Sequence, residues 1–307
     1  MTPLQAPLSP EEVLTQIAAA LPPACREHVI IIGSLAAGYH FFAGDGQRSI
    51  RTKDVDCMFT PHATAVATAQ EVTVQLLNAG WTPRMEGKWS DPGDAQTPAN
   101  QLPLVRLKPP ESGQTQDWFV EMLGAPDQHS GDMKTFHRVI TDQGHYAICS
   151  FNFLGLTEHD AALTPTGLRL ATPEMMALAN MLHHPTIGPE LIAGTTTKRS
   201  NKDLGRVLAL AWLTAERDKR AGSAELEAWP ERMFAALKSR FPDSFRQLAK
   251  TAGAGIRELS GSQADMQQAL IECNRGLLSS MEVGLDAFAA TARRFVQLVV
   301  EPLEQSF

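Results

Sequence analysis

The sequence predicts an α+β protein in which a β-sheet with flanking helices is followed by an α-helical C-terminal domain. Short apolar and β-branched runs alternate with helical segments up to about residue 160. From Thr172-Pro173-Glu174 onward the pattern is almost entirely helical. Hydrophobic residues make up 43% and charged residues 20% of the 307-residue chain, which is typical of a globular protein with a substantial core. We therefore expect two domains, at residues 1–165 and 166–307.

The first elements are indicated by clear start and stop signals. Ser9-Pro10-Glu11-Glu12 predicts a helix start, with a capping serine, proline at the first helical position and acids in the first turn. This helix is expected to run to about Ala20. The β-branched run His28–Ile32 predicts a buried strand that ends at Gly33, and Ser34–Phe42 is expected to form a short helix.

The rest of the N-terminal domain continues this mixture of strands and helices. Further strands are indicated by apolar or β-branched runs at residues 53–59, 81–85, 102–108, 117–123 and 144–154. Residues 63–79 are expected to be helical, closed by Gly80. Residues 86–101 are polar and rich in glycine, proline and aspartate, so we expect a loop there. The runs at 102–108 and 117–123 are expected to pair as a hairpin.

Bulk composition excludes several classes of protein. The formal charge of −7 argues against a chain that binds polyanions over its whole surface, so any contact with RNA would need a local basic patch. The four cysteines are far apart in sequence and form no CxxC, which favours buried free thiols. The N-terminus lacks a secretion signal, and no apolar stretch approaches the roughly 20 residues that span a bilayer. We expect a cytoplasmic protein with no membrane partner.

The strongest functional signal is Gly33-Ser34 followed by Asp54-Val55-Asp56. A strand that delivers Gly33 and Ser34 to a helix N-terminus presents backbone N–H groups to a phosphate, and the serine adds a hydroxyl donor. Asp54 and Asp56 lie two apart on a strand, so their side chains share one face. Two such carboxylates repel each other unless a cation such as Mg²⁺ neutralises them. The pattern therefore indicates phosphoryl chemistry.

A second metal ion would need a third carboxylate, and the run from Asp117 to Leu123 offers two. Asp117 lies at the start of the strand, where solvent can stabilise its charge. Glu121 lies within the apolar part of the run, where an unpaired carboxylate is costly, so we favour Glu121 as the third metal ligand. The alternative is that Glu121 is an exposed strand residue paired with an arginine such as Arg106.

Residues 28–123 resemble the nucleotidyltransferase superfamily of the polymerase-β type. The residues that carry the resemblance are the apolar strand Val29–Ile32, the pair Gly33-Ser34, the motif Asp54-Val55-Asp56 between Lys53 and Cys57-Met58-Phe59, and the later acid Glu121. The resemblance implies a nucleotidyltransferase-like mixed β-sheet with flanking helices. It also implies an NTP substrate and Mg²⁺ or Mn²⁺ held by Asp54, Asp56 and Glu121, which would be the catalytic residues.

The C-terminal part resembles the AbiEii/MenT branch of that superfamily, which includes toxins of toxin–antitoxin and phage-defence systems. The resemblance rests on Thr172-Pro173-Glu174 opening a helix, then Lys198-Arg199 and Lys202-Asp203-Leu204. It implies that Lys198 or Lys202 contacts the triphosphate and that Asp203 is the carboxylate at a helix start. Many relatives carry a lysine after Pro-Glu, whereas residues 177–181 contain none, so the choice between the two lysines is open. A solvated helix start is the alternative for this basic cluster.

The expected reaction transfers a nucleoside monophosphate from an NTP to an acceptor and releases pyrophosphate. Three hypotheses about the function remain open. A toxin-like enzyme would modify tRNA or another RNA and could have an antitoxin protein as partner. An enzyme acting on a small molecule or a protein side chain is favoured by the negative net charge. A non-catalytic descendant would only bind nucleotide, and the intact Asp54/Asp56 pair argues against it. A cyclic-oligonucleotide synthase belongs to the same superfamily.

Overall fold

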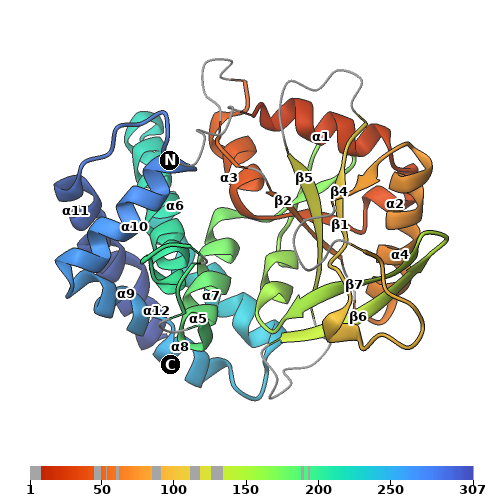
Figure 1. Cartoon of the computed structure of the whole chain (residues 1–307). Helices are drawn as coiled ribbons and strands as arrows, with labels where there is room; N and C mark the ends of the chain where they lie inside the picture. Colours follow the sequence, from red (N-terminus) through yellow and green to blue (C-terminus); the bar gives the residue numbers. More distant parts are fainter. Residues whose placement is uncertain are drawn as a thin grey trace. The chain divides into compact units, whose positions relative to one another are not determined.

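The computed structural model has an α+β fold with a mixed β-sheet and a helical C-terminal region (Figure 1). It describes residues 8–44, 50–52, 54–59, 62–84, 91–110, 118–125, 134–187, 190–192 and 194–306. The chain divides into two compact units. The first consists of residues 1–39 and 43–171, and the second of residues 40–42 and 172–307. The predicted fold class is confirmed at this level.

The first unit contains the sheet. Its strands within the described residues are β1 (Val29–Ile31), β2 (Asp54–Phe59), β3 (Thr82–Pro83), β4 (Arg106–Lys108), β5 (Phe119–Gly124), β6 (Lys134–Thr141), β7 (Gly144–Phe151), β8 (Ala162–Leu163) and β9 (Arg169–Leu170). They are ordered β3-β4-β5-β2-β1-β9-β8, and β7 pairs with both β5 and β6. The sheet is mixed because β2 runs antiparallel to β1 and parallel to β5.

Helices α1 (Pro10–Ala19), α2 (Pro23–Arg26), α3 (Gly33–Phe42) and α4 (His62–Asn78) complete the first part of the chain. The predicted start of α1 is confirmed, because the Ser9 hydroxyl accepts a hydrogen bond from the Glu12 N–H at 3.4 Å and Pro10 is the first helical residue. Helix α4 packs against β2, β5 and β6. The sheet core includes Ile30, Ile31 and Met58, all fully buried.

Several strand predictions are confirmed and others need correction. The predicted hairpin of β4 and β5 forms, with Arg106 opposite Glu121. β6 was not predicted, and neither were the short strands β8 and β9. Within the predicted loop at 86–101, residues 91–101 contain a turn of 3₁₀ helix (Ala99–Gln101) and a bridge from Gly93 to His145. Lys53, Asp117 and residues 85–90 and 111–116 lie outside the described residues.

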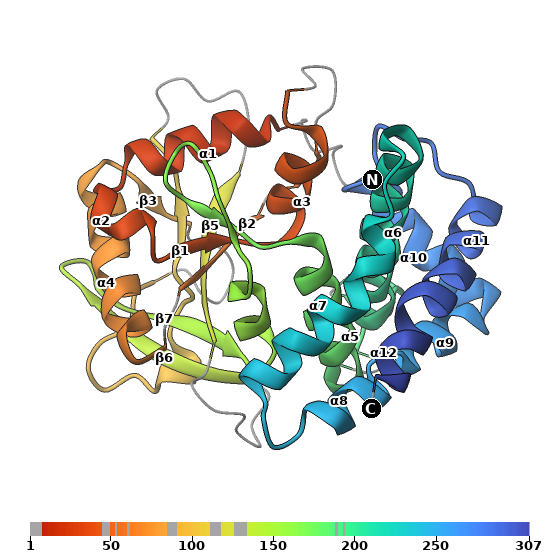
Figure 2. The same ribbon diagram turned by 180° about the vertical axis from the view of Figure 1, so that it is seen from behind.

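The second unit is helical, as the sequence predicts. Its described helices are α5 (Pro173–Ile187), α6 (Arg199–Ala221), α7 (Glu225–Arg240), α8 (Phe245–Thr251), α9 (Ala254–Ser260), α10 (Gln263–Arg275), α11 (Leu285–Phe295), the π-helical segment η4 (Val296–Val300) and α12 (Glu301–Gln305). Helix α6 packs against α5, α7, α10 and α11 (Figures 1 and 2). Trp229 and Phe295, both fully buried, meet edge to face at 6.1 Å.

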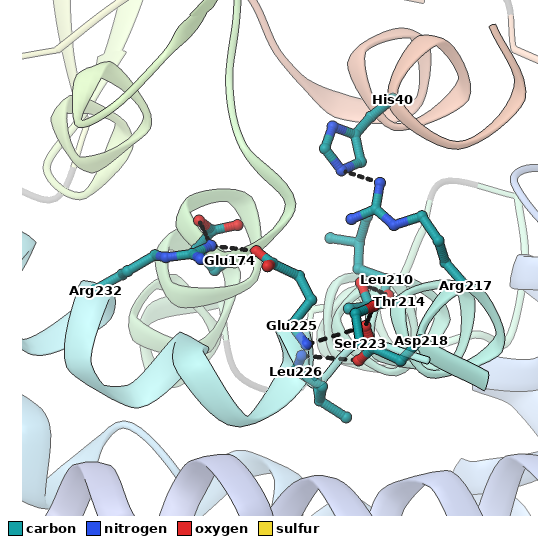
Figure 3. A network of polar contacts seen from close by, with 10 residues as sticks. All are labelled: His40, Glu174, Leu210, Thr214, Arg217, Asp218, Ser223, Glu225, Leu226 and Arg232. Atoms are coloured by element: carbon teal, nitrogen blue, oxygen red, sulfur yellow. Dashed lines mark hydrogen bonds and ion pairs between the residues drawn. The ribbon is translucent and has the colours of Figure 1, made fainter. Parts of the chain in front are cut away.

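A polar network joins three helices of the second unit to residues 40–42 (Figure 3). Arg217 Nη1 donates to His40 Nε2 at 2.7 Å, and the Arg217 guanidinium lies over the Phe41 ring at 5.1 Å. Arg232 forms ion pairs with Glu174, at 3.1 Å, and with Glu225. The network therefore ties α7 to α5, and α6 to the last turn of α3.

The cysteines and the helix lengths bear on two further predictions from the sequence. Cys25, Cys57, Cys149 and Cys273 are all free and buried, which confirms the expectation from their spacing. Burial is the largest cause that raises the pKa of the Cys57 thiol, and the charge of Asp56 raises it further. Among the helices that the structure describes, none combines the length and apolarity needed to cross a bilayer.

Candidate functional site

The two aspartates of the Asp-x-Asp motif lie on β2, beside the end of β1. Their positions are half-buried, whereas Val55 and Cys57 between and after them are fully buried, so the two carboxylates share the more open face as predicted. Ile31 is opposite Cys57 in the antiparallel register, and the Ile32 N–H donates to the Asp56 carbonyl at 2.9 Å. Ile32 is thus beside Asp56 on the neighbouring strand, and the next residue, Gly33, lies close to the Asp56 side chain.

The backbone of Gly33 lies close to the Asp56 carboxylate. A Cβ added to Gly33 would lie 2.7 Å from Asp56 Oδ2, closer than non-bonded atoms approach. The backbone of Gly33 also has φ +70°, a conformation that favours glycine. Glycine is favoured here by its backbone conformation, and a larger residue would in addition require the Asp56 carboxylate to shift away from the start of α3.

Helix α3 begins at Gly33, with Ile32 in the capping position and no side-chain hydrogen bond to the cap. Ser34 is thus within the first turn and does not cap the helix. The N–H groups of a first turn carry a partial positive charge and favour an anion. Gly33 is the first residue of α3 and lies close to the Asp56 carboxylate, so the start of the helix is beside Asp56. The predicted phosphate cradle and the predicted carboxylate pair are adjacent.

Asp54 is anchored by its neighbour. The Thr52 hydroxyl lies 2.7 Å from Asp54 Oδ1 and 3.0 Å from the Asp54 carbonyl oxygen, so it can donate to either. Thr52 itself is buried. This contact orients the Asp54 carboxylate.

Glu121 lies one strand away on the same face. In the parallel register of β2 and β5, Glu121 is directly opposite Asp56, and Phe119 is opposite Asp54. Residues in register on neighbouring strands project from the same face, so the structure brings the three predicted carboxylates to one surface. The side chain of Glu121 is only 14% exposed.

Glu121 is engaged by Arg106, its partner on β4. Arg106 Nε lies 3.0 Å from Glu121 Oε2, and Nη2 lies 3.3 Å from Oε1, which is a bidentate pair. The arginine pairing weighed as an alternative is therefore present, although Glu121 is largely buried and not exposed. Among the described side chains, no group of three or more His, Cys, Asp or Glu residues is arranged to hold a metal ion.

A second arginine lies on this face, and sequence reasoning missed it. The Arg84 guanidinium stacks 4.0 Å from the centroid of the Phe119 ring, and that of Arg106 lies 5.8 Å from the same ring. The Arg84 N–H donates to the Arg106 carbonyl at 2.7 Å, which extends the pairing of β3 with β4. Arg84 lies within the predicted strand at residues 81–85, but nothing in the local sequence indicates which face of the sheet its side chain joins.

Lys198, Lys202 and Asp203 belong to the second unit, at the start of α6. Lys198 is the residue before the helix, and its Nζ lies 3.1 Å from Asp265 Oδ2. The Asn201 amide is the largest cause that lowers the pKa of Asp265, and Lys198 lowers it further. Lys202 is half-buried, and Asp203 is buried with an oxygen 3.9 Å from His183 Nδ1.

The site residues therefore form two groups. Asp54, Asp56 and Glu121 lie on one face of the sheet, and Gly33-Ser34 at the start of α3 lies beside Asp56, all within the first unit. Carboxylate oxygens such as those of Asp54 and Asp56 are the ligand type that suits a hard divalent cation, while the Glu121 carboxylate is paired with a guanidinium. In comparisons with known proteins, no family model, no curated protein and no solved structure matches the chain.

Proposed function

We propose that the chain is a metal-dependent nucleotidyltransferase, with a nucleotidyltransferase-like first unit, that moves a nucleoside monophosphate from an NTP to an acceptor. The observation that carries the proposal is the contact between the start of α3 and the Asp-x-Asp strand: a Cβ on Gly33 would come within 2.7 Å of Asp56 Oδ2. A helix N-terminus thus adjoins a carboxylate pair, which is the combination that phosphoryl transfer needs.

Each part of the face has a proposed task. Ser34 and the first N–H groups of α3 bind phosphate oxygens of the NTP, and Asp54 and Asp56 supply oxygen ligands for Mg²⁺ or Mn²⁺. When bound, the ion would neutralise charge on the triphosphate and make its α-phosphorus more electrophilic. Glu121 completes the acidic face, and it reaches a second ion only when its pair with Arg106 opens.

The bond changes follow from this arrangement. An acceptor hydroxyl oxygen attacks the α-phosphorus in line with the bond to the β-phosphate. The new P–O bond forms as the bond to the leaving oxygen breaks, and pyrophosphate departs. The hydroxyl proton passes to a carboxylate of the face or to solvent. In the second unit, Lys198 or Lys202 contacts the triphosphate, and Asp203 at the start of α6 supports that contact.

The preferred acceptor is tRNA or another RNA, modified by a toxin or phage-defence enzyme whose partner is an antitoxin protein. Lys198, Arg199, Lys202 and Arg206 supply a local basic cluster at the start of α6, which supports contact with an RNA backbone. The alternative is transfer to a small molecule or a protein, which the net charge of −7 favours.

The test is a transfer assay. Purified protein is incubated with Mg²⁺, each α-³²P-labelled NTP in turn, and total tRNA, and label on the RNA is measured. We expect label with at least one NTP and its loss in Asp54→Asn and Asp56→Asn, because each substitution removes a charged oxygen ligand while preserving side-chain shape. The matched control is Asp243→Asn, at an exposed position in the second unit.

The outcomes separate the alternatives. Label that depends on Asp56 but not on Asp243 supports an RNA-modifying enzyme. Unlabelled RNA, together with Mg²⁺-dependent nucleotide binding that Asp56→Asn abolishes, moves the acceptor to a small molecule or a protein. Transfer that persists undiminished in both aspartate variants contradicts the proposed site.

A further inference from the structure

Arg106 is held in place by three separate contacts. Its backbone is fixed by strand pairing, which sets Arg106 opposite Glu121. Its guanidinium makes a bidentate pair with the Glu121 carboxylate, at 3.0 and 3.3 Å. The same guanidinium lies 5.8 Å from the centroid of the Phe119 ring. A planar guanidinium restrained in this way is more rigid than a surface ion pair, which forms and breaks readily.

Opening this pair would be unfavourable. Glu121 is only 14% exposed, whereas Arg106 is 36% exposed. Withdrawing the guanidinium would leave a largely buried carboxylate without a counter-ion, and such a charge is destabilising until another cation replaces it. A second metal ion at Glu121 would therefore have to displace a cation that already satisfies both carboxylate oxygens.

The charges on this face also argue against a second metal ion. Asp54, Asp56 and Glu121 carry three negative charges, and Arg84 and Arg106 bring two positive charges to the neighbourhood of Phe119. A second ion bound at Glu121 would add two further positive charges near the two guanidinium groups, and like charges repel each other.

We propose that Arg106 takes the place of a second metal ion, so that this face binds one divalent cation through Asp54 and Asp56 while Arg106 remains on Glu121. The inference rests on the proposed function and narrows it. Glu121 becomes a positioning residue, because it fixes the Arg106 guanidinium beside the site. Arg106 then supplies a positive charge that needs no dissolved metal and directs it at the substrate phosphates.

The test counts bound metal in the full-length protein. Mn²⁺ alone is titrated and the free ion is measured by electron paramagnetic resonance. We expect one ion in the wild-type protein, none in Asp54→Asn/Asp56→Asn, and one in Glu121→Gln with an affinity within about twofold of wild type, because Glu121 is not a ligand. Arg106→Gln should gain a second ion at the released carboxylate, and Arg106→Gln/Glu121→Gln should return to one.

Other numbers of bound ions would contradict the inference. The inference is overturned if the wild-type protein binds no ion, or binds two with one lost in Glu121→Gln. A folded Arg106→Gln that still binds one ion also overturns it. If Arg106→Gln fails to fold, the inference is tested by comparing the number of ions bound by the wild-type protein with the number bound by Glu121→Gln. The count is independent of transfer: two ions with active transfer would refute only the role of Arg106, whereas one ion without transfer would refute only the proposed reaction.

Discussion

At the scale of single residues, His40 shows how burial and a neighbouring charge set a protonation state. Arg217 can only donate hydrogen bonds, so His40 Nε2, 2.7 Å from Arg217 Nη1, must accept, and the ring is neutral (Figure 3). Burial is the largest cause that lowers the pKa of His40 to about 4, the charge of Arg217 lowers it further, and Glu225 acts in the opposite direction. Local sequence could not indicate this, because the two partners are 177 positions apart.

This residue predicts a pH dependence of stability. The pKa of His40 is depressed from 6.5 to about 4 in the folded state, so the unfolded state binds more protons between those values. The contribution of His40 is fully present above pH 6.5 and is lost as the pH falls towards 4. Denaturant unfolding of His40→Gln at pH 7 and pH 5 should therefore show a smaller loss of free energy of unfolding on acidification than wild type.

The control for this experiment is His28→Gln, because the side chain of His28 is 38% exposed and belongs to a different region of the chain. That variant should retain the wild-type pH dependence. A His40→Gln protein whose stability falls with pH as steeply as wild type would show that His40 is not the group that titrates.

At the scale of elements, α7 begins without a capping side chain of its own. Asp218, on α6, supplies the cap: it accepts from the N–H groups of Glu225 and Leu226, both at 3.0 Å, and from the Ser223 hydroxyl at 2.6 Å. Burial is the largest influence on the pKa of Asp218 and raises it, but these hydrogen bonds outweigh burial and leave the pKa below its usual value.

Removing this cap should destabilise the second unit. Asp218→Ala leaves two first-turn N–H groups of α7 without acceptors, and the loss of a capping side chain costs about 1–2 kcal/mol of the free energy of unfolding. Chemical denaturation monitored by circular dichroism measures the change. Asp286→Ala is the matched control, because Asp286 is an acid in the first turn of α11, a helix that begins without a side-chain cap. Equal stability of the two variants would contradict the capping role.

The elements also show what local sequence can predict and what it cannot. The strand before Gly33, the Asp-x-Asp strand and the β4–β5 hairpin were predicted, because each has a local signal of β-branched residues, alternation or a turn. β6 was missed because its eight residues are mostly half-buried and their apolar pattern is weak. The pairing of Arg106 with Glu121 depends on strand register, which local periodicity leaves open.

At the scale of the whole molecule, the division into two units does not follow the chain order. Helix α3 contributes Gly33 and Ser34 to the first unit and its last three residues, 40–42, to the second. The helix that begins at the proposed phosphate site therefore ends within the packing of the helical unit. No composition shift marks this, because α3 is a single continuous helix, so the predicted boundary could only be drawn as one cut in the sequence.

This arrangement predicts that a change in α3 weakens the second unit. Phe42 is 3% exposed, and Phe→Ala at a buried site costs about 3–5 kcal/mol. In Phe42→Ala, hydrogen exchange measured by mass spectrometry should become faster in α6 as well as in α3. The matched control is Phe153→Ala, also buried but within the first unit, where faster exchange should be confined to the sheet. Unchanged exchange in α6 of Phe42→Ala would contradict the assignment of residues 40–42 to the second unit.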